Sequence, residues 1–256
     1  MSRKKEANKL LSMAILAGKI MLENGAETYR VEDTITRICK SRDYVTYAEP
    51  FVIPTGILMA IGCEDDIMTY IQRTKSKTTD LNKITLVNEF SRNFVNSHMS
   101  VDEGFECLKK IDEVKAYSSI INIIFGGIAG GFFSLLFGGT FKDFVSAFLI
   151  SIIVVTTSKM LSKINMIYFI NNFVAAAIAT IFAILTVKIG LGNNMDRIII
   201  GTIMPLVPGL AITNATRDSM LGDFLAGMSR GIEAIIVALS IAFGVGLILV
   251  LYHGGI

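Results

Sequence analysis

The sequence predicts an α-helical membrane protein with five transmembrane helices, preceded by a small cytosolic α+β domain. The first observation is that charge is segregated, because residues 1–117 carry 17 of the 24 Lys and Arg and 17 of the 22 Asp and Glu. The second is that residues 118–256 contain apolar runs of the length that crosses a bilayer, about 20 residues each. A single soluble domain does not divide its charges in this way. We therefore predict a cytosolic α+β domain over 1–117 and a transmembrane domain over 118–256.

The N-terminal part carries helix signals followed by strand signals and further helix signals. Asn24 and Glu27 have the spacing of a capping box, which predicts the start of a helix. Pro50 and the turn at 54–56 predict the ends of short strands. We expect helices over 10–21, after Asn24, from Thr79 or Asp80 to 96 and from Ser100, with antiparallel strands over 44–49, 57–62 and 67–73.

Composition excludes several classes of function. No basic run with interleaved aromatic residues is present, so we expect no nucleic-acid partner. The three cysteines have no CxxC or Cys/His spacing, so we expect reduced thiols, no metal site and no cofactor. The sequence contains no Walker A lysine motif, and His98 has no evident Cys, Ser or metal partner, so we do not expect an enzyme. The charged N-terminus does not resemble a signal peptide.

Five stretches of the C-terminal part are candidates for membrane spans. Pro205 and Pro208 interrupt the fourth, and because proline lacks a backbone donor, we expect that helix to kink or unwind up to Gly209. Glycines spaced by four in the first stretch predict close helix packing, either within the chain or in a homo-oligomer. The predicted spans run over 118–140, 144–161, 166–187, 198–215 and 232–252.

The orientation follows from Lys and Arg near the spans, which concentrate on the cytosolic side of a membrane. With residues 1–117 in the cytosol, most of these side chains lie inside, and Lys142, Lys188 and Arg197 lie outside. Five spans in the lipid bilayer then predict a multi-pass protein with its N-terminus in the cytosol and its C-terminus outside.

The segment over 205–233 is unusually polar for its apolar surroundings. Ionisable groups at membrane depth are expensive and commonly functional. An arginine can hold a carboxylate with two hydrogen bonds, and a partly buried aspartate can carry a proton. On a continuous helix Asp223 and Arg230 would share a face, and Arg230 could pair with Glu233. The alternative is a solvated cytosolic turn between two spans, with its arginines serving only topology.

Two blocks of sequence together carry a family resemblance. They are MLENGAETYRVEDTITRI at 21–38 and PGLAITNATRDSMLGDFLAGMSR at 208–230. With PTG at 54–56 and a soluble part before five spans, they resemble the threonine/serine exporter family, most closely its split, YjjP-type subunit. That subunit corresponds to the N-terminal half of full-length members, and the resemblance covers nearly the whole chain.

The resemblance implies a secondary, proton-coupled exporter of small carboxylate-bearing solutes, of the threonine and serine type, in the cell inner membrane. It also implies a separate small membrane protein that supplies the C-terminal half of full-length members. The motif residues of the membrane block are Pro208, Gly209, Asn214, Arg217, Asp218, Gly222, Asp223 and Arg230. We hypothesise that Arg217 or Arg230, with Asn214, binds the solute carboxylate and that Asp218 or Asp223 handles the proton. Pro208 and Gly209, with Pro205, would shape the helix break.

The resemblance also brings out a motif in the soluble part, formed by Gly25, Glu27, Arg30 and Glu32. We expect this motif to dock as a gate at the cytosolic mouth, on the same side of the membrane as 214–230. Two other functions stay open. The chain could belong to a succinate-type dicarboxylate exporter, or it could be a membrane-anchored sensor or scaffold whose working part is the soluble domain.

Overall fold

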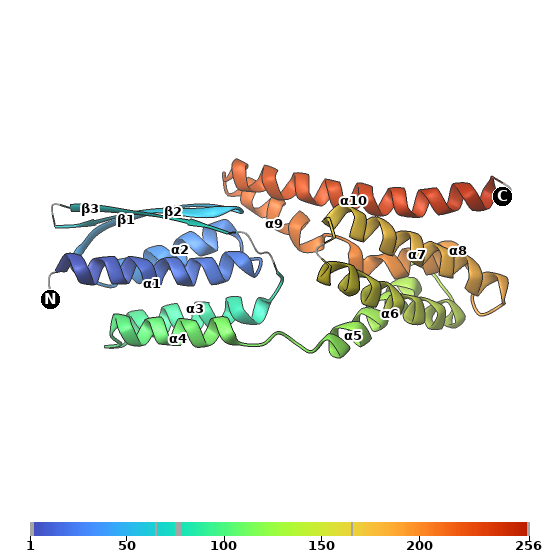
Figure 1. The fold of residues 1–256 in the computed structure, drawn as a ribbon, viewed down its shortest axis with the longest axis horizontal. Coiled ribbons are helices and arrows are strands. Elements are labelled where there is room, and N and C mark those ends of the chain that lie inside the picture. Colours follow the sequence, from blue (N-terminus) through green and yellow to red (C-terminus); the bar gives the residue numbers. More distant parts are fainter. Residues whose placement is uncertain (1–2, 65, 75–77, 165, 255–256) are drawn as a thin grey trace. The chain divides into compact units, whose positions relative to one another are not determined.

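The computed structural model describes residues 3–64, 66–74, 78–164 and 166–254, which are mostly helical with one small sheet near the N-terminus (Figure 1). The chain forms two compact units, and each is described by itself. The first unit combines Met1–Ala116 with Leu210–Gly231, and the second combines Tyr117–Gly209 with Ile232–Ile256. The polar segment that the sequence places in the membrane part therefore packs with the N-terminal residues.

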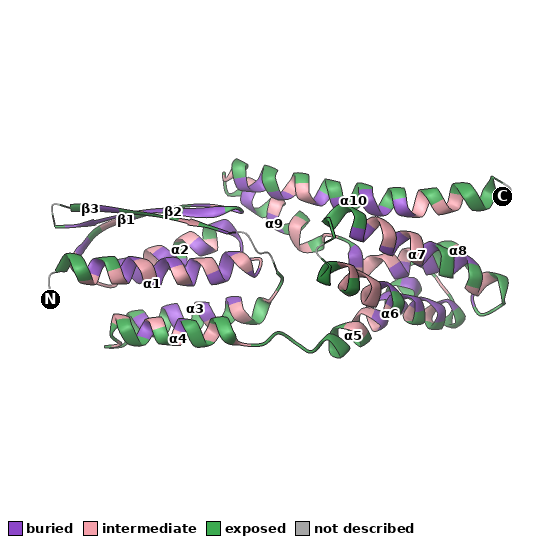
Figure 2. Cartoon of the chain, viewed as in Figure 1, coloured by how far each residue is buried: buried purple, intermediate pink, exposed green. Residues whose placement is uncertain are grey.

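The sheet of the first unit is antiparallel, in the order β1 (Val45–Ile53), β2 (Gly56–Cys63) and β3 (Asp66–Arg73). This confirms the small antiparallel sheet that the sequence predicts. Helices α1 (Arg3–Glu23) and α2 (Thr28–Lys40) pack on one side of it (Figure 2). Leu10, Ile35 and Ile57 are fully buried in one hydrophobic cluster, so the apolar faces of the helices and sheet make the core.

Strand β1 runs through Pro50 to Ile53, so the prediction that it ends before Pro50 is wrong. The reason is the orientation of the strand edge. The backbone N–H of Val52 donates to Glu32 Oε1 at 2.9 Å, away from β2, and residue 50 has the same orientation as residue 52 in a strand. The backbone N–H that Pro50 lacks would therefore point to the open edge of β1 and not to β2. Proline is tolerated at such an edge, because no ladder hydrogen bond is lost.

Two further helices complete the N-terminal part, α3 (Leu81–Asn96) and α4 (Val101–Glu113). Asp80 caps α3 by accepting from the backbone of Asn82 and Lys83, and Ser100 forms a reciprocal capping box with Glu103 at the start of α4. Both starts agree with the sequence prediction.

The capping box predicted at Asn24 is wrong, because the N-cap of α2 is Glu27. Helix α1 ends instead in a Schellman motif: Gly25 has φ +95°, its N–H donates to Leu22 O, and the N–H of Ala26 donates to Met21 O. The Asn24 side chain donates to Ile20 O. Gly25 thus reverses the chain, and the residues after it leave the end of α1 at a fixed angle.

The second unit contains α5 (Ser119–Leu136), α6 (Phe141–Lys163), α7 (Tyr168–Lys188), α8 (Met195–Ile203) and the one-turn helix η1 (Met204–Leu206). A Cβ atom on Gly130 would lie 1.9 Å from Ser151 Oγ in α6, and one on Gly201 in α8 would lie 2.5 Å from the Gly130 carbonyl oxygen. The glycines of α5 therefore allow close packing within this chain.

Among the described residues, four helices are long and apolar enough to cross a membrane: α5, α6, α7 and α10 (Phe224–His253). A fifth span exists if α8 with η1 and the following α9 (Gly209–Met220) count as one broken span. The predicted span over 198–215 is therefore two helices, separated at Val207 and Pro208. Helix α10 begins at Phe224, before the predicted start at 232, because polar residues of its first turns pack within the first unit.

Candidate functional site

The site lies in the first unit, where α9 and the first turns of α10 meet the start of α2. A second Schellman motif ends α9: Gly222 has φ +92°, its N–H donates to Ser219 O, and the N–H of Asp223 donates to Asp218 O. Gly227 then lets α10 approach α9, since a Cβ atom there would lie 2.9 Å from Ala215 O. The reversal brings the charged residues of both helices to the same side.

Glu27 joins the two sequence blocks through its carboxylate. Its Oε2 receives the Arg30 Nε at 3.0 Å, and its Oε1 receives the Arg30 Nη2 at 3.4 Å and Nη1 of Arg217. The Glu27 side chain is 11% exposed, whereas that of Arg217 is 45% exposed. Glu27 is thus a buried anion shared by two guanidinium groups that reach solvent.

Asp218 and Arg230 form a second, deeper pair. Their Oδ2 and Nε atoms are 3.2 Å apart, and the Asp218 side chain is completely buried. Thr28 donates its hydroxyl to Asp218 Oδ1 at 3.0 Å, and Arg230 Nη2 donates to the Ala26 carbonyl at 2.7 Å. Burying both charges is costly unless they are paired, and here each charge has its partner and one further hydrogen bond.

These contacts bring together most of the residues that the sequence analysis proposes. We call Glu27, Thr28, Arg30, Arg217, Asp218 and Arg230 the Glu27 cluster. Asn214 lies beside it and donates from Nδ2 to the Gly25 carbonyl at 2.9 Å. Gly25 itself contributes the turn and a carbonyl rather than a side chain.

Other proposed residues lie outside these contacts. Asp223 accepts from the backbone N–H of Ala226 at 3.1 Å and caps the start of α10. Asp223 and Arg230 both follow the reversal at Gly222, as the cap and a residue of the same helix, but the carboxylate that pairs with Arg230 is that of Asp218. Pro205 lies in η1, and Pro208 and Gly209 lie at the start of α9.

Glu32 is attached to the sheet rather than to the arginines. Its Oε1 accepts the edge N–H of Val52, and it is half-buried. Burial raises the pKa of the Glu32 carboxyl, the hydrogen bond from Val52 opposes this rise, and the charges of Asp223 and Asp218 add to it.

Sequence reasoning missed Thr28 and Asp143. Thr28 follows Glu27 in the first block. Thr28 is completely buried, and the sequence pattern did not reveal this burial. Asp143, also completely buried, accepts from the backbone N–H groups of Thr140, Asn193 and Asn194 and joins two loops of the second unit. The capping-box spacing from Thr140 to Asp143 is the signal that could have found it.

The directly bonded side chains of the Glu27 cluster carry a net positive charge. Three guanidinium groups contact two carboxylates, which leaves one positive charge in excess within the directly bonded set. Arg217 is the most exposed of the three, and among the described residues Glu27 is the acceptor that holds its guanidinium. Arg217 is therefore the guanidinium of this set that a carboxylate from solvent can contact most readily.

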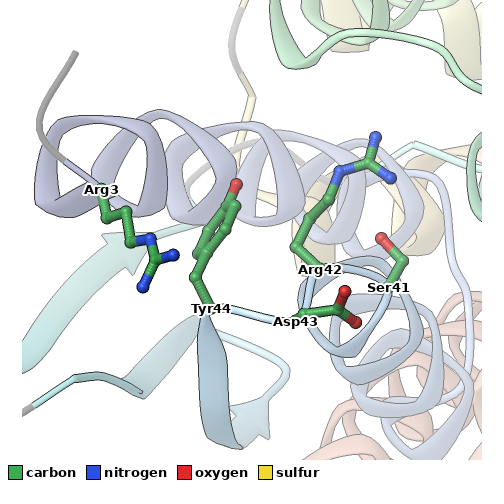
Figure 3. Close-up of a pocket in the computed structure, with 5 residues that line it drawn as sticks. All are labelled: Arg3, Ser41, Arg42, Asp43 and Tyr44. Carbon is green, nitrogen blue, oxygen red and sulfur yellow. The ribbon is translucent and has the colours of Figure 1, made fainter.

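Cavities elsewhere in the first unit involve different residues. One of about 440 Å³ is lined by Arg3, Ser41, Arg42, Asp43 and Tyr44, with the Tyr44 ring drawn between the two arginines (Figure 3). Arg42 is already held by the Met99 carbonyl at 2.6 Å, and Arg3 by Glu64 at 3.2 Å. Within the described residues no group of three or more His, Cys, Asp or Glu could hold a metal ion.

Comparison with known proteins identifies a family whose match includes both sequence blocks of the Glu27 cluster. Residues 12–252 match the model of a family described as "Putative threonine/serine exporter". The chain belongs to the threonine/serine exporter family. Members of this family are described as transporters rather than enzymes, and the apolar helices indicate a multi-pass membrane protein.

Relatives in the family include both long and short proteins. The chain is 21% identical to the "Probable threonine/serine exporter" of Mycobacterium tuberculosis and 22% identical to the "Threonine/serine exporter" of Corynebacterium glutamicum, with 93% of the chain covered in each case. It covers 45% and 50% of these relatives, so it spans about half their length.

A third relative is similar in length. The chain is 20% identical to the "Probable succinate transporter subunit YjjP" of Klebsiella aerogenes, over 94% of the chain and 93% of that relative. No solved structure matches the chain.

Proposed function

We propose that this chain is a subunit of a secondary exporter that moves small carboxylate-bearing solutes across the inner membrane, using the proton gradient. The observation that carries the proposal is the half-exposed guanidinium of Arg217, held by Glu27 in a cluster with one excess positive charge. We favour solutes of the threonine and serine type, since two relatives bear those names. The succinate-type alternative is supported by the third relative.

In this proposal the carboxylate of the solute takes the place of Glu27 at Arg217. Arg217 is the better candidate than Arg230, whose side chain is 10% exposed and is committed to Asp218 and the Ala26 carbonyl. Arg30 keeps Glu27 in place after the exchange, because its fork contacts both carboxylate oxygens. Asn214 holds the Gly25 turn and so positions Glu27.

We assign proton coupling to Asp218 rather than Asp223. Asp218 is completely buried, and its Oδ2 is ion-paired with Arg230 Nε at 3.2 Å but receives no hydrogen bond within the described part of the chain, which leaves a lone pair for a proton. Protonation would remove its charge from Arg230 and weaken the contact between α2 and the α9–α10 reversal. Asp223, in contrast, has the role of a helix cap.

The proposal also includes location and a partner. We propose that residues 1–117 are cytosolic and that residues 118–256 form the membrane domain, with 210–231 as a cytosol-facing part of it. A separate small membrane protein completes the transporter, as the word "subunit" in the name of the similarly long relative suggests. Gating by the motif around Glu27 is then the role of the N-terminal part.

The test is efflux of labelled threonine, serine and succinate from cells that contain the chain with and without a candidate partner. We expect Arg217→Ala to lower efflux by about 10- to 100-fold, the loss of a hydrogen-bonded charge interaction, and Arg217→Lys to restore part of it. Arg37→Ala is the matched control, since Arg37 lies in α2 and pairs with Asp33 outside the cluster. Normal efflux by Arg217→Ala would show that the site assignment is wrong.

The proton assignment is tested with a matched pair of variants. In Asp218→Asn we expect solute exchange to continue while a pH gradient no longer drives net export, whereas Asp223→Asn keeps the gradient-driven export. Equal coupling in both variants would contradict the assignment. If no solute moves under any condition, and charge neutralisation in 214–230 changes no property of the chain, the sensor or scaffold function becomes the better account.

A further inference from the structure

One face of the sheet is apolar and uncovered in the first unit. Phe51, Leu58 and Ile71 lie side by side across the three strands, because Phe51 pairs with Leu58 and Leu58 pairs with Ile71. They are 47%, 40% and 74% exposed. The residues that alternate with them point to the core beneath α1 and α2, where Val52 and Ile57 are fully buried. An apolar row across an open sheet face indicates an interaction site.

The strand register arranges this face as a small grid. The three rows nearest the β1–β2 turn, read from β1 to β3, are Glu49–Ala60–Thr69, Phe51–Leu58–Ile71 and Ile53–Gly56–Arg73, and a further row, Tyr47–Gly62–Ile67, lies beyond them. Large residues lie next to small ones around the central Leu58. Glu49 and Arg73 lie at opposite corners, and neither has an ion-pair partner in the described ranges of the chain.

We propose that this face binds the same face of a second copy of the chain, about a twofold axis that runs along the diagonal through Ile53, Leu58 and Thr69. After rotation about that diagonal, the strands of the second copy run across the strands of the first. The two sheets then cross at about 90°, which is one of the two preferred ways in which sheets pack face to face. Leu58 meets Leu58 of the second copy at the centre.

The same rotation matches the remaining grid positions. Phe51 comes over Gly56 of the second copy, and Ile71 comes over Ala60, so each large side chain meets a small one. Glu49 comes opposite Arg73, and the symmetry makes this ion pair twice. The spacing is about 6.7 Å between rows and about 4.8 Å between strands, so the matched positions agree to about 2 Å next to Leu58 and to about 3 Å at the corners, which long side chains can bridge.

A second copy explains the face better than other partners do. Self-complementarity of size and of charge about one axis is what an isologous dimer requires. An anionic lipid surface attracts an excess of Lys and Arg, whereas this grid carries one acidic and one basic residue. The face is small, so we expect a weak dimer that forms because the membrane confines the chains.

The experiment measures self-association of the full chain in lipid vesicles by energy transfer between differently labelled copies. We expect Glu49→Arg and Arg73→Glu each to raise the dissociation constant by about tenfold, and the double variant to restore it. Ile71→Asp should dissociate the dimer. Ile67→Asp is the matched control, because Ile67 is 70% exposed on the same strand but its rotated position falls outside the second sheet.

Crosslinking then identifies the axis. In a Cys107→Ser background, we expect Leu58→Cys to crosslink with itself. Glu49→Cys should crosslink with Arg73→Cys when the two variants are mixed, and neither should crosslink alone. A monomer at all densities, a dimer indifferent to these changes, or single reversals without rescue in the double variant would each overturn the proposal. The last two results would indicate assembly through the helices, or a lipid or another protein on this face.

Discussion

At the scale of single residues, two glutamates of one motif have different tasks. Glu27 contacts two arginines, whereas Glu32, five residues further on, accepts the open-edge N–H of Val52. The family resemblance placed both in one motif. The difference arises because α2 turns Glu32 toward β1, while Glu27 lies before the first turn of α2 at the end of α1. One glutamate therefore belongs to the proposed transport site and the other to the sheet.

Glu32 gives the chain a predictable pH dependence. Because burial raises its pKa in the folded chain above 4.5, the folded chain holds this proton more tightly than the unfolded chain does. The associated stability is fully present below 4.5 and is lost as the pH rises through the folded pKa. We expect thermal unfolding of the full chain in detergent, followed between about pH 4 and 8, to show this loss.

The matched variants isolate the contribution of Glu32. We expect Glu32→Gln to flatten the fall of the unfolding temperature with rising pH, since a neutral amide oxygen still accepts from Val52. Glu89→Gln, at a residue of α3 outside these contacts, should leave the slope unchanged. A slope that is the same in Glu32→Gln and in the unmodified chain would show that Glu32 does not titrate in this way.

At the scale of helices, glycine decides how closely elements approach. Gly201 and Gly130 bring α8 and α5 together at backbone distance, whereas a Cβ atom added to Gly246 in α10 would meet no atom within 4 Å. A glycine at a close helix contact and a glycine that faces open space cannot be told apart in an apolar sequence. Asp143 acts at the same scale, because its hydrogen bonds fix the loop before α6 to the loop before α8.

This difference predicts unequal effects of one substitution. Gly201→Ala places a methyl group 2.5 Å from the Gly130 carbonyl oxygen, a backbone atom that cannot move aside. We expect it to lower the free energy of unfolding by about 1–3 kcal/mol and the unfolding temperature accordingly. Gly246→Ala is the control and should change the unfolding temperature little. Equal effects in thermal unfolding would contradict the packing described here.

At the scale of the whole molecule, the number of spans decides which side of the membrane each end occupies. Within the described residues there are four candidate spans if the broken pair of α8–η1 and α9 does not cross, and five if it does. The proposed orientation, with the N-terminus in the cytosol and the C-terminus outside, requires an odd number. The Glu27 cluster includes residues of α9 and α10, so this count also bears on the side from which solute would reach Arg217 in the proposed function.

Thiol labelling with a membrane-impermeant reagent tests the orientation. We expect Lys5→Cys to react only after the cells are opened and His253→Cys to react in intact cells. The background is low once Cys107 is replaced, because Cys39 and Cys63 are buried and burial raises the pKa of Cys39 to about 12, which suppresses the reactive thiolate. Labelling of both positions from the same side would contradict five spans.

The sequence by itself determined the elements that depend on local signals. Ser100 and Glu103 set a helix start, and the long apolar runs set the candidate spans. The break after Pro205 follows from the missing donors of proline. The capping box at Asn24 and the end of β1 at Pro50 failed, because the Schellman turn at Gly25 and the open edge of β1 depend on neighbours that a local pattern does not contain.

Only the tertiary structure decided which charged residues meet. Residues about 190 positions apart come together where Glu27 meets Arg217 and Thr28 meets Asp218. It also separated the two candidate arginines, because Arg230 is buried against Asp218 while Arg217 reaches solvent. The physical reason is that hydrophobic periodicity and capping act within a few turns of chain, whereas the partner and the burial of a charge depend on the closing of long loops.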